Sequence, residues 1–530
     1  MRRARHADGY KSPKSKLARF FRKSRDRWKE KARESKAVIR RLKNRIGFLE
    51  RSKARLQDKF TELEQELCRV KRESRERAEE LEAVKKDSNA PTTEALEAFE
   101  RVPACHAYSI GHVSLFLSLV LSAASSLRGA SRCMEIFMRA FELEYATPSW
   151  WAGRLWLLRL GYYKLMQAQE HAGDWVWIVD HTVQLGVEKC LVILGIRLSN
   201  LPVGRSVGHA DVEPLALYPV KHSNGEVVFE QLEQSVSKTG VPREIVADHG
   251  SDLEAGIERF CKAHPETVSV YDIKHESALL LKHLLQADED WEAFTSLAAR
   301  TKSQLQQTAL AFLAAPNQRS KARYMNLDTL IGWGTNVLEF LDSPKGAEHN
   351  TQGQLEEKLG WVKGFRAQLQ EWNALLELTT TAESVVRTQG IYRGCEHVLD
   401  KQLVPRVNTP RTERVREQLV RFAAGQALKA RAGERLLGSS EVIESMFGKL
   451  KRIERDQARS GFTALVLSIP AMVSTTTQEV IHKALETVPT KKIAEWSKEF
   501  LGKSIQAQRK EAFRGTSKKE QNRDQLHVAT

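Results

Sequence analysis

The spacing of apolar residues changes at about residue 174, and this change restricts the fold more than any other feature of the chain. Before it the apolar residues follow a helical period, whereas after it short, continuous apolar runs are typical of buried strands. The predicted order is three strands, a helix, a strand, a helix and a strand, at residues 174–180, 188–198, 214–220, 226–239, 243–248, 253–263 and 268–273. Because strands joined through a helix run parallel, residues 174–275 are predicted to form a mixed α/β sheet.

The remainder of the chain has helical patterns on both sides of this sheet. Residues 94–165 are expected to form a helical unit, and residues 276–435 an all-helical insertion within the α/β domain. A helix beginning near Ser440 would open the last part of that domain, residues 436–490. The fold class is therefore α/β, with a large helical insertion between two parts of the core.

A heptad pattern within residues 31–86 predicts a coiled coil ahead of the helical unit. Nine of ten core positions are apolar, and only Lys53 departs from the pattern. The ten positions are Ile39, Leu42, Ile46, Leu49, Lys53, Leu56, Phe60, Leu63, Leu67 and Val70. We therefore expect a homodimer or a higher homo-oligomer, with Lys53 helping to fix the register or the number of partners.

Positive charge is concentrated at the N-terminus. The chain has a net charge of +16, and residues 1–60 alone contain 23 Lys and Arg against six Asp and Glu. A basic arm over residues 1–30 points to an anionic polymer as partner: nucleic acid, or less often a membrane surface. The alternative is a merely solvated helix exterior. A second basic stretch, residues 491–530, lacks an apolar period and is predicted to be a mobile tail.

The chain contains no segment that favours a membrane. The best candidate, Ile110–Leu127, includes His112 and several serines, so a buried helix of a soluble domain is expected. No signal peptide is predicted, and the six cysteines show no metal-ligand spacing, which favours a reduced cytosolic setting.

A helix-turn-helix pattern is present within residues 94–165. Ser149 is the natural N-cap of a second helix, in which Trp150, Leu155 and Leu158 can face a core. Arg154 and Arg159 would then remain outside and contact DNA. The alternative is a pair of packed helices with the same spacing and no DNA contact.

Two aspartates stand at the ends of predicted strands, Asp180 in WIVDHT and Asp248 in IVADHGSD. The first and fourth strands are expected to be neighbours, which would bring the two carboxylates together. Since two close carboxylates repel each other unless a divalent cation lies between them, Mg²⁺ or Mn²⁺ is the expected occupant. The alternative is that each aspartate only caps a turn or a helix.

A third acid is expected on the helix that follows Ser440. Glu444 and Lys451 are seven residues apart, so they share one helix face. Glu444 could face the metal while Lys451, with Lys449, Arg452 and Arg455, contacts DNA phosphates. Glu441, one turn earlier, is the rival for the third acid. A salt-bridged surface helix would also fit these charges.

The segments WIVDHT, IVADHGSD and SSEVIESMFGKLK resemble the three acidic motifs of DDE transposases, which have an RNase H-like core. The Glu444-to-Lys451 spacing is similar to the Glu-x6-Lys element of several bacterial insertion-sequence groups. The Tyr-x2-Arg-x3-Glu signature is absent before Glu444. The resemblance implies Asp180, Asp248 and Glu444 as catalytic metal ligands, DNA as substrate (transposon ends and target), and a bacterial cytoplasmic location near the nucleoid.

The expected activity is metal-dependent DNA cleavage and strand transfer. The alternatives are a non-catalytic, sequence-specific DNA-binding protein derived from a transposase, and a structural coiled-coil adaptor.

Neighbouring residues are expected to support the site rather than bind the metal. Hydrogen-bonding or core roles are predicted for His181, His249 and His275, although His249 and His275 could contact a phosphate. Asp252 and Asp272 are alternative acids around the site. Trp333 could stabilise a flipped base, but a core position is favoured.

Overall fold

The computed structural model describes residues 18–29, 36, 100–140, 142, 145–183, 188–248, 250–318, 327–343, 354–454, 463–503 and 508–513. The chain divides into two units, Met1–Pro91 with Arg300–Ala314, and Thr92–Ala299 with Ala315–Thr530. Of the N-terminal part of the first unit, residues 18–29 and residue 36 are described, and they are helical. The predicted coiled coil at 31–86 therefore lies almost entirely outside the described residues. Most of the described residues belong to the second unit.

A five-stranded mixed sheet forms the centre of the second unit. Its strands are β1 (Trp175–Val183), β2 (Lys189–Arg197), β3 (Glu213–Val220), β4 (Glu244–Ala247) and β5 (Val268–Tyr271). Their order is β3-β2-β1-β4-β5, where β2 is antiparallel to β1 and β3, and β1, β4 and β5 run parallel. The predicted α/β class and the contact between the first and fourth strands are thus confirmed.

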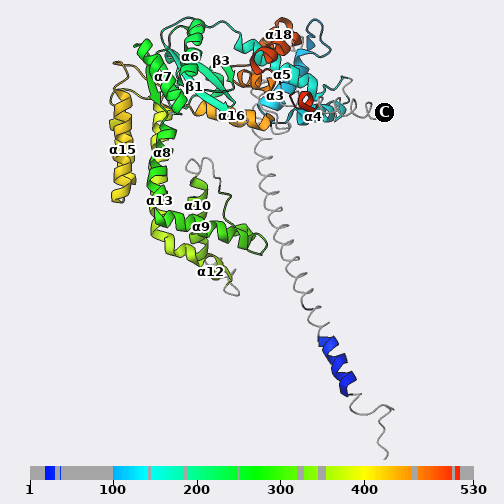
Figure 1. The fold of residues 1–530 in the computed structure, drawn as a ribbon, viewed down its shortest axis with the longest axis vertical. Coiled ribbons are helices and arrows are strands. Elements are labelled where there is room, and N and C mark those ends of the chain that lie inside the picture. Colours follow the sequence, from blue (N-terminus) through cyan, green and yellow to red (C-terminus); the bar gives the residue numbers. More distant parts are fainter. Residues whose placement is uncertain are drawn as a thin grey trace, which may run out of the picture. The chain divides into compact units, whose positions relative to one another are not determined.

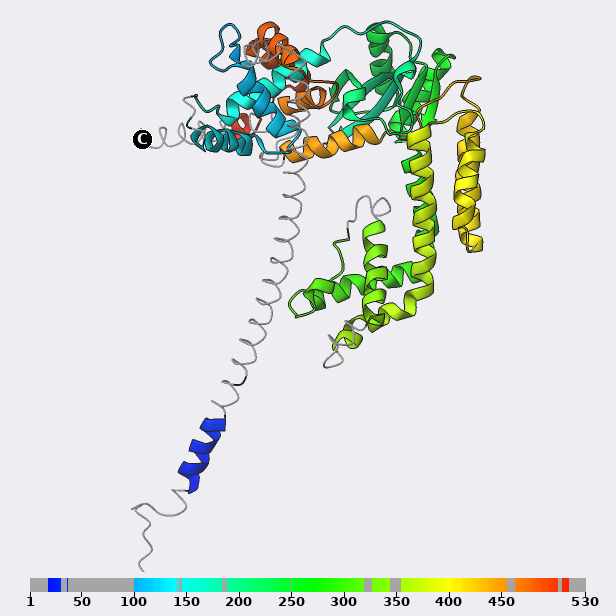
Figure 2. The same cartoon turned by 180° about the vertical axis from the view of Figure 1, so that it is seen from behind.

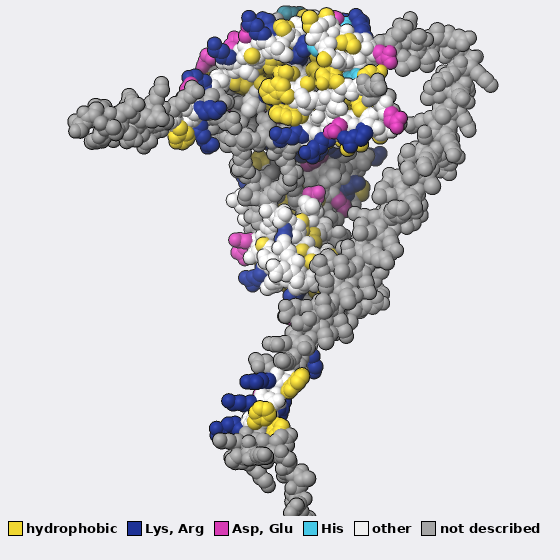
Figure 3. Space-filling view, turned by 90° about the vertical axis from the view of Figure 1, so that its right-hand side faces the viewer, with side chains coloured by type: hydrophobic (Ala, Val, Ile, Leu, Met, Phe, Trp, Pro, Cys, Tyr) yellow, Lys and Arg dark blue, Asp and Glu magenta, His cyan; other side chains and the backbone are white. Residues whose placement is uncertain are grey.

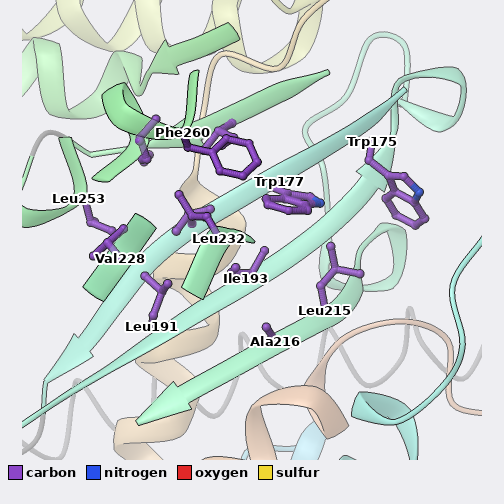
Figure 4. Packing of buried hydrophobic residues seen from close by; sticks show 14 residues of the cluster. Trp175, Trp177, Leu191, Ile193, Leu215, Ala216, Val228, Leu232, Leu253 and Phe260 are labelled. Atoms are coloured by element: carbon purple, nitrogen blue, oxygen red, sulfur yellow. The ribbon is translucent and has the colours of Figure 1, made fainter. Parts of the chain in front are cut away.

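Two helices cover one face of the sheet (Figure 1): α6 (Gly225–Thr239) and α7 (Ser251–Ala263). The side chain of Asn224 caps the start of α6, and Gly240, with φ of 81°, ends it. Apolar side chains of both helices pack against alternate residues of β1 and β2, including Trp177 and Leu191 (Figure 4). This packing assigns Trp175, Trp177 and Val179 to one face of β1, so Ile178 and Asp180 belong to the other.

The opposite face of β1 is contacted by α16 (Glu441–Glu454), which runs along the sheet in both ribbon views (Figures 1 and 2). Its buried residues include Ile443, Met446 and Leu450, which follow the helical period. The predicted helix start near Ser440 is confirmed.

The helical unit before the sheet comprises α3 (Ile110–Leu121), α4 (Leu127–Ala140) and α5 (Trp150–Leu165). It packs against helices from the end of the chain: α17 (Ser468–Met472), α18 (Gln478–Thr487) and α19 (Thr490–Trp496) all contact α5. The contact near α17 is very close, because a Cβ on Gly161 would lie 1.7 Å from the Leu467 carbonyl oxygen.

The structure differs from the predicted helix-turn-helix in two ways. Ser149 does cap α5, since its side chain accepts a hydrogen bond from Ala152 N. However, residues 141–149 separate α4 from α5, a longer connection than the turn of about 3–4 residues in that motif. The predicted positions of Trp150 in the core and Arg159 outside are wrong, because Trp150 is 37% exposed and Arg159 only 8%.

In the described residues of the insertion, the regular structure is helical apart from one isolated bridge between Ile391 and Leu436. Its helices are α8 (Ile273–Gln286), α9 (Glu289–Leu305), α10 (Asp328–Asp342), α12 (Gln354–Leu359), α13 (Arg366–Gln389), α14 (Cys395–Leu403) and α15 (Pro410–Ala427). Short 3-10 turns, including η5 (Gly360–Phe365), connect them. Trp333 is half-buried there, and its ring centroid lies 6.1 Å from that of Phe294 and 6.2 Å from that of Trp361. Trp333 therefore packs among aromatic rings, although it is less buried than the predicted core position requires.

Two further predictions need correction. Strand β1 does not end at Asp180, since its pairing with β2 continues to Val183 opposite Lys189. The predicted mobile tail does not begin at 491, because Ile493 and Trp496 of α19 are buried. Within the described residues, no helix is both long and apolar enough to cross a membrane.

Candidate active site

Three neighbouring strands and one helix carry the acidic side chains. Asp180 lies on β1, Asp248 follows β4, and Asp272 follows β5, where it caps α8. Since β1, β4 and β5 are parallel neighbours, their carboxyl-terminal ends meet at one edge of the sheet. Glu444 joins them from the first turn of α16.

The other three carboxylates are close enough to Asp180 to affect its ionisation. The pKa of Asp180 is raised well above its usual value, first by burial and then by the negative charge of Asp248, with smaller contributions from Glu444 and Asp272. A hydrogen bond of 2.6 Å from the His181 backbone N–H opposes the rise without cancelling it. The structure thus brings the three predicted acids into one electrostatic cluster.

Asp272 is the most enclosed of the four acids, being 0% exposed. Its Oδ1 accepts a hydrogen bond of 2.6 Å from the backbone N–H of Lys274. Its Oδ2 accepts from the backbone N–H of Ser440, also at 2.6 Å, and from the Ser440 hydroxyl. Asp272 therefore ties the start of α8 to the residue that precedes α16, which positions Glu444 relative to the sheet.

His275 lies among these acids. Its Nε2 is 3.8 Å from Asp248 Oδ2, and its Nδ1 is 3.7 Å from Glu444 Oε1 and 4.0 Å from Asp272 Oδ2. The Nδ1 atom is buried and has no hydrogen-bond partner. Among the described residues, Asp272, His275 and Glu444 offer ligand atoms within 4.8 Å of one another and could hold a metal ion.

The two candidate glutamates of α16 have different partners. Lys274 Nζ donates to Glu444 Oε2 at 2.7 Å, and this bond and the charge of Glu444 raise the pKa of Lys274 despite its burial. Glu441 instead pairs with Arg387 of α13. Glu444, unlike Glu441, is among the groups whose charge raises the pKa of Asp180. These contacts therefore favour Glu444 over Glu441 as the glutamate of α16 that acts with Asp180.

Asp252 belongs to a separate cluster. Its Oδ2 lies 2.6 Å from Lys189 Nζ and 3.7 Å from His181 Nδ1. Hydrogen bonds and nearby positive charge lower the pKa of Asp252 to about 2, and burial lowers that of His181 to about 4. His181 is thus neutral, and its Nε2 lies 3.4 Å from the Ser223 hydroxyl, in line with the predicted hydrogen-bonding role. His249 lies outside the described residues.

The cations of α16 lie beyond its acidic first turn. Lys451 and Arg452 are exposed, whereas Lys449 is partly buried and 3.0 Å from His209 Nδ1. Arg455 is outside the part of the chain that the structure describes. Lys449 and Arg452 line a hollow together with Ser122, Ser125 and Ser126 of the α3–α4 connection.

Of the two arginines predicted on the outer face of α5, only Arg154 is partly exposed. Arg159 donates from Nε to the Val488 carbonyl at 2.5 Å, and also to the Leu485 carbonyl. Because its guanidinium binds the end of α18, Arg159 is unavailable to DNA, and its predicted role as a DNA contact is wrong.

Sequence reasoning undervalued Asp272, His275 and Lys274. The sequence does contain a signal for Asp272. In YDIKHE this aspartate stands at the end of a predicted strand, and that strand is next to the predicted strand that ends at Asp248. An aspartate and a histidine three residues apart at a helix start also point to the same side. The bond from Ser440 to Asp272, across 168 residues, could not have been read from local pattern.

Comparison with known proteins adds a distant structural likeness. No family model matches the chain, and no curated protein matches it. Among solved structures, the chain is similar to the Drosophila P element transposase strand transfer complex, at 10% sequence identity and a TM-score of 0.34. The match covers 77% of this chain and 99% of that chain. At so low a TM-score the likeness is distant and carries no functional argument.

Proposed function

We propose that the chain is a DDE-type DNA transposase, which cleaves DNA and transfers strands with the help of Mg²⁺ or Mn²⁺ held by Asp180, Asp248 and Glu444. The observation that carries the proposal is that these acids, on β1, after β4 and on α16, come together, since the charges of Asp248 and Glu444 add to the effect of burial in raising the pKa of Asp180. The strand order β3-β2-β1-β4-β5, with β2 antiparallel, supports the RNase H-like core that the acidic motifs imply.

The residues present suit a divalent cation. Burial first, and then the negative charge of the neighbouring carboxylates, raise the pKa of Asp180, and a cation placed among these acids would relieve that repulsion. The buried, unpartnered Nδ1 of His275 lies beside two of them. Carboxylate oxygens are the ligands that Mg²⁺ prefers. When bound, such ions activate the attacking oxygen and stabilise the leaving oxygen of a phosphoryl transfer.

The chain's own residues have distinct roles in this proposal. Asp272 and Ser440 hold the start of α16 against the sheet and so bring Glu444 close enough for its charge to act on Asp180. Lys274 fixes the Glu444 carboxylate in position through its ion pair. Lys451 and Arg452, exposed near the far end of α16, would bind phosphates of the same DNA strand. Glu444 to Lys451 spans about 10 Å of helix.

The test replaces each acid by its amide and follows two properties, nicking of a supercoiled plasmid with Mn²⁺ and Mn²⁺ binding by calorimetry. Asp180→Asn, Asp248→Asn and Glu444→Gln should each lower nicking by about 100-fold or more, because each removes a ligand charge. DNA binding in EDTA should be unchanged. Glu441→Gln, which changes an acid one turn earlier on α16, is the matched control and should retain activity.

Full nicking by Asp180→Asn would refute the site. Loss of nicking in Glu441→Gln, with Glu444→Gln still active, would mean that Glu441 is the third metal-binding acid.

A non-catalytic DNA-binding protein is the second candidate function. The observation that favours it is the ion pair between Lys274 and Glu444, since a positive charge already compensates one of the three acids. This candidate predicts that the unmodified protein binds DNA, shows no Mn²⁺ binding, and neither nicks plasmid nor joins a pre-cleaved DNA end to a target.

A further inference from the structure

The C-terminal half of α5 is enclosed by the protein. Arg159 and Lys164 are 8% and 4% exposed, and both donate hydrogen bonds to carbonyls near α17 and α18. Burial lowers the pKa of Lys164 to about 8. A recognition helix must present several residues to a DNA groove. In α5 only the first turn is free to do so.

That first turn displays two large aromatic side chains. Trp150 is 37% exposed and Trp151 51%, and their ring centroids are 5.6 Å apart in an edge-to-face arrangement. An arginine lies over each ring: the Arg128 guanidinium is 5.0 Å from the centroid of Trp150, and that of Arg154 is 5.2 Å from the centroid of Trp151. We call these four residues the Trp/Arg platform.

The platform is held in place by the surrounding backbone. The Ser131 hydroxyl of α4 donates to the Pro148 carbonyl at 2.7 Å, which ties the start of α5 to the helix that carries Arg128. The Ser149 side chain caps α5 immediately before the two tryptophans. The backbone that carries the two rings is therefore held in place before any ligand arrives, which lowers the entropic cost of binding.

Charge around the platform favours a polyanion. Helix α5 contains no acidic residue, and α4 contains three arginines and a single acid, Glu135, which pairs with Arg139. Figure 3 views the molecule from the side on which Figure 1 draws α4, and exposed hydrophobic side chains gather there with Lys and Arg beside them. An apolar surface with this charge suits nucleic acid better than it suits another basic protein surface.

We propose that the Trp/Arg platform binds unpaired bases of single-stranded DNA by stacking. Tryptophan rings and arginine guanidinium planes are the groups on which unstacked bases pack, and such stacking requires no particular base sequence. A paired duplex hides its base faces, so the platform distinguishes an opened or single-stranded segment from intact duplex. This role is separate from the acidic site and needs no metal.

The test measures binding of a fluorescent oligothymidylate of about 20 nucleotides, in EDTA, by anisotropy. Trp151→Ala should weaken this binding about tenfold, the effect expected for the loss of one stacked base. Trp151→Phe should recover most of the affinity, because a phenyl ring still stacks. Affinity for a blunt duplex should change by less than about twofold, whereas a duplex with a single-stranded 3′ extension should behave like the oligothymidylate.

Two matched controls lie on α4. Ile136→Ala removes an apolar side chain that is 63% exposed but has no aromatic ring on which a base could stack, so it should leave binding unchanged. Arg139→Ala removes the same charge as Arg154→Ala, from an arginine paired to Glu135. Arg154→Ala should therefore weaken binding more than Arg139→Ala does.

Equal loss of single-stranded and duplex binding in Trp151→Ala would overturn the proposal, and so would failure of Trp151→Phe to restore binding. A change of oligomeric state in Trp151→Ala, with unchanged DNA affinity, would assign the platform to contact between copies of the chain. Failure of the plasmid-nicking test would leave these results unaffected, because no metal or cleavage enters them.

Discussion

At the scale of single residues, two aspartates of this domain have opposite electrostatic environments. Burial and three neighbouring carboxylates raise the pKa of Asp180. Lys189 and Ser223 contribute to lowering the pKa of Asp252 to about 2, although burial alone would raise it. The ionised form of Asp180 therefore opposes folding in the absence of metal, while the ionised form of Asp252 favours it.

This contrast predicts opposite effects of two equivalent substitutions. Burial and neighbouring charges raise the pKa of Asp180 in the folded state, so its neutral form stabilises the fold. This stability is present at low pH and is lost as pH rises through the raised pKa. In EDTA near neutral pH, Asp180→Asn should raise Tm by about 2–4 °C, the shift that about 1 kcal/mol gives in domains of about 150–250 residues. The gain should shrink as pH is lowered toward about 4, the usual carboxyl range.

Asp252→Asn is the control with the opposite sign. Its charge stabilises the fold above the usual carboxyl pKa, and this stability is lost as pH falls toward about 2. Near neutral pH this substitution should lower Tm by a similar amount. Scanning calorimetry of both variants from mildly acidic to mildly alkaline pH checks the pair. A fall of Tm in metal-free Asp180→Asn would contradict the electrostatic account.

Residue-level predictions succeeded where a local pattern was sufficient. Ser149 follows Pro148 and precedes an apolar helix, so its role as N-cap could be read directly. Arg159 could not be placed in this way, because its acceptors, the carbonyls of Leu485 and Val488, are more than 300 residues away. A helical period shows which residues share a face, but not which distant segment covers that face.

At the scale of elements, the return of the chain from the insertion to the sheet positions the third acid. Residues 434–440 bind along the start of β4 and the end of β5. The Leu437 N–H donates to Glu244 Oε2 at 2.9 Å, and the Ile273 N–H donates to the Gly438 carbonyl at 3.1 Å. Beside them, Arg243 forms two hydrogen bonds with Glu434, of 2.8 and 2.7 Å. Together these contacts fix the direction in which α16 begins.

The Arg243–Glu434 pair predicts a specific double-mutant result. Their side chains are only 4% and 12% exposed, so removal of one leaves an almost buried, unpaired charge. Arg243→Met alone should lower the free energy of unfolding by about 3 kcal/mol, whereas Arg243→Met with Glu434→Met should lower it by less. Urea denaturation of the two single variants and the double variant measures the coupling. Strictly additive losses would show that the pair does not act as a unit.

The elements themselves were largely predictable, but their contacts were not. The apolar runs of the strands and the caps of α6 are local signals, and each predicted strand is present within a few residues. The short turn predicted before α5 was wrong because residues 141–149 form a longer connection. The mobile tail predicted after residue 490 was wrong because the chain there is ordered by contacts with a distant helix, through the packing of α19 on α5. Local pattern contains no information about those contacts.

At the scale of the whole molecule, the most basic part of the sequence is separate from the residues proposed to act on DNA. Residues 1–60 contain 23 Lys and Arg against six Asp and Glu, whereas the acidic cluster and the Trp/Arg platform belong to the second unit. Phosphate contacts by a basic arm release counterions, so the affinity they provide falls steeply with salt. Base stacking neutralises no phosphate and so releases no counterions. The two contributions to DNA binding should therefore differ in their salt dependence.

Deletion of residues 1–30 tests this separation. The segment contains 12 Lys and Arg and three Asp and Glu, and its removal leaves the predicted coiled coil over 31–86 in place. The slope of log K against log salt for duplex DNA should decrease in magnitude by several units, since each phosphate that the arm neutralises contributes about 0.9. Trp151→Ala should weaken single-stranded binding at every salt concentration with an unchanged slope. Sedimentation at each step shows whether the oligomeric state is preserved. An unchanged slope after the deletion would mean that the arm's charge is only a solvated surface, and phosphate binding would then have to come from cations such as Lys451 and Arg452 of α16.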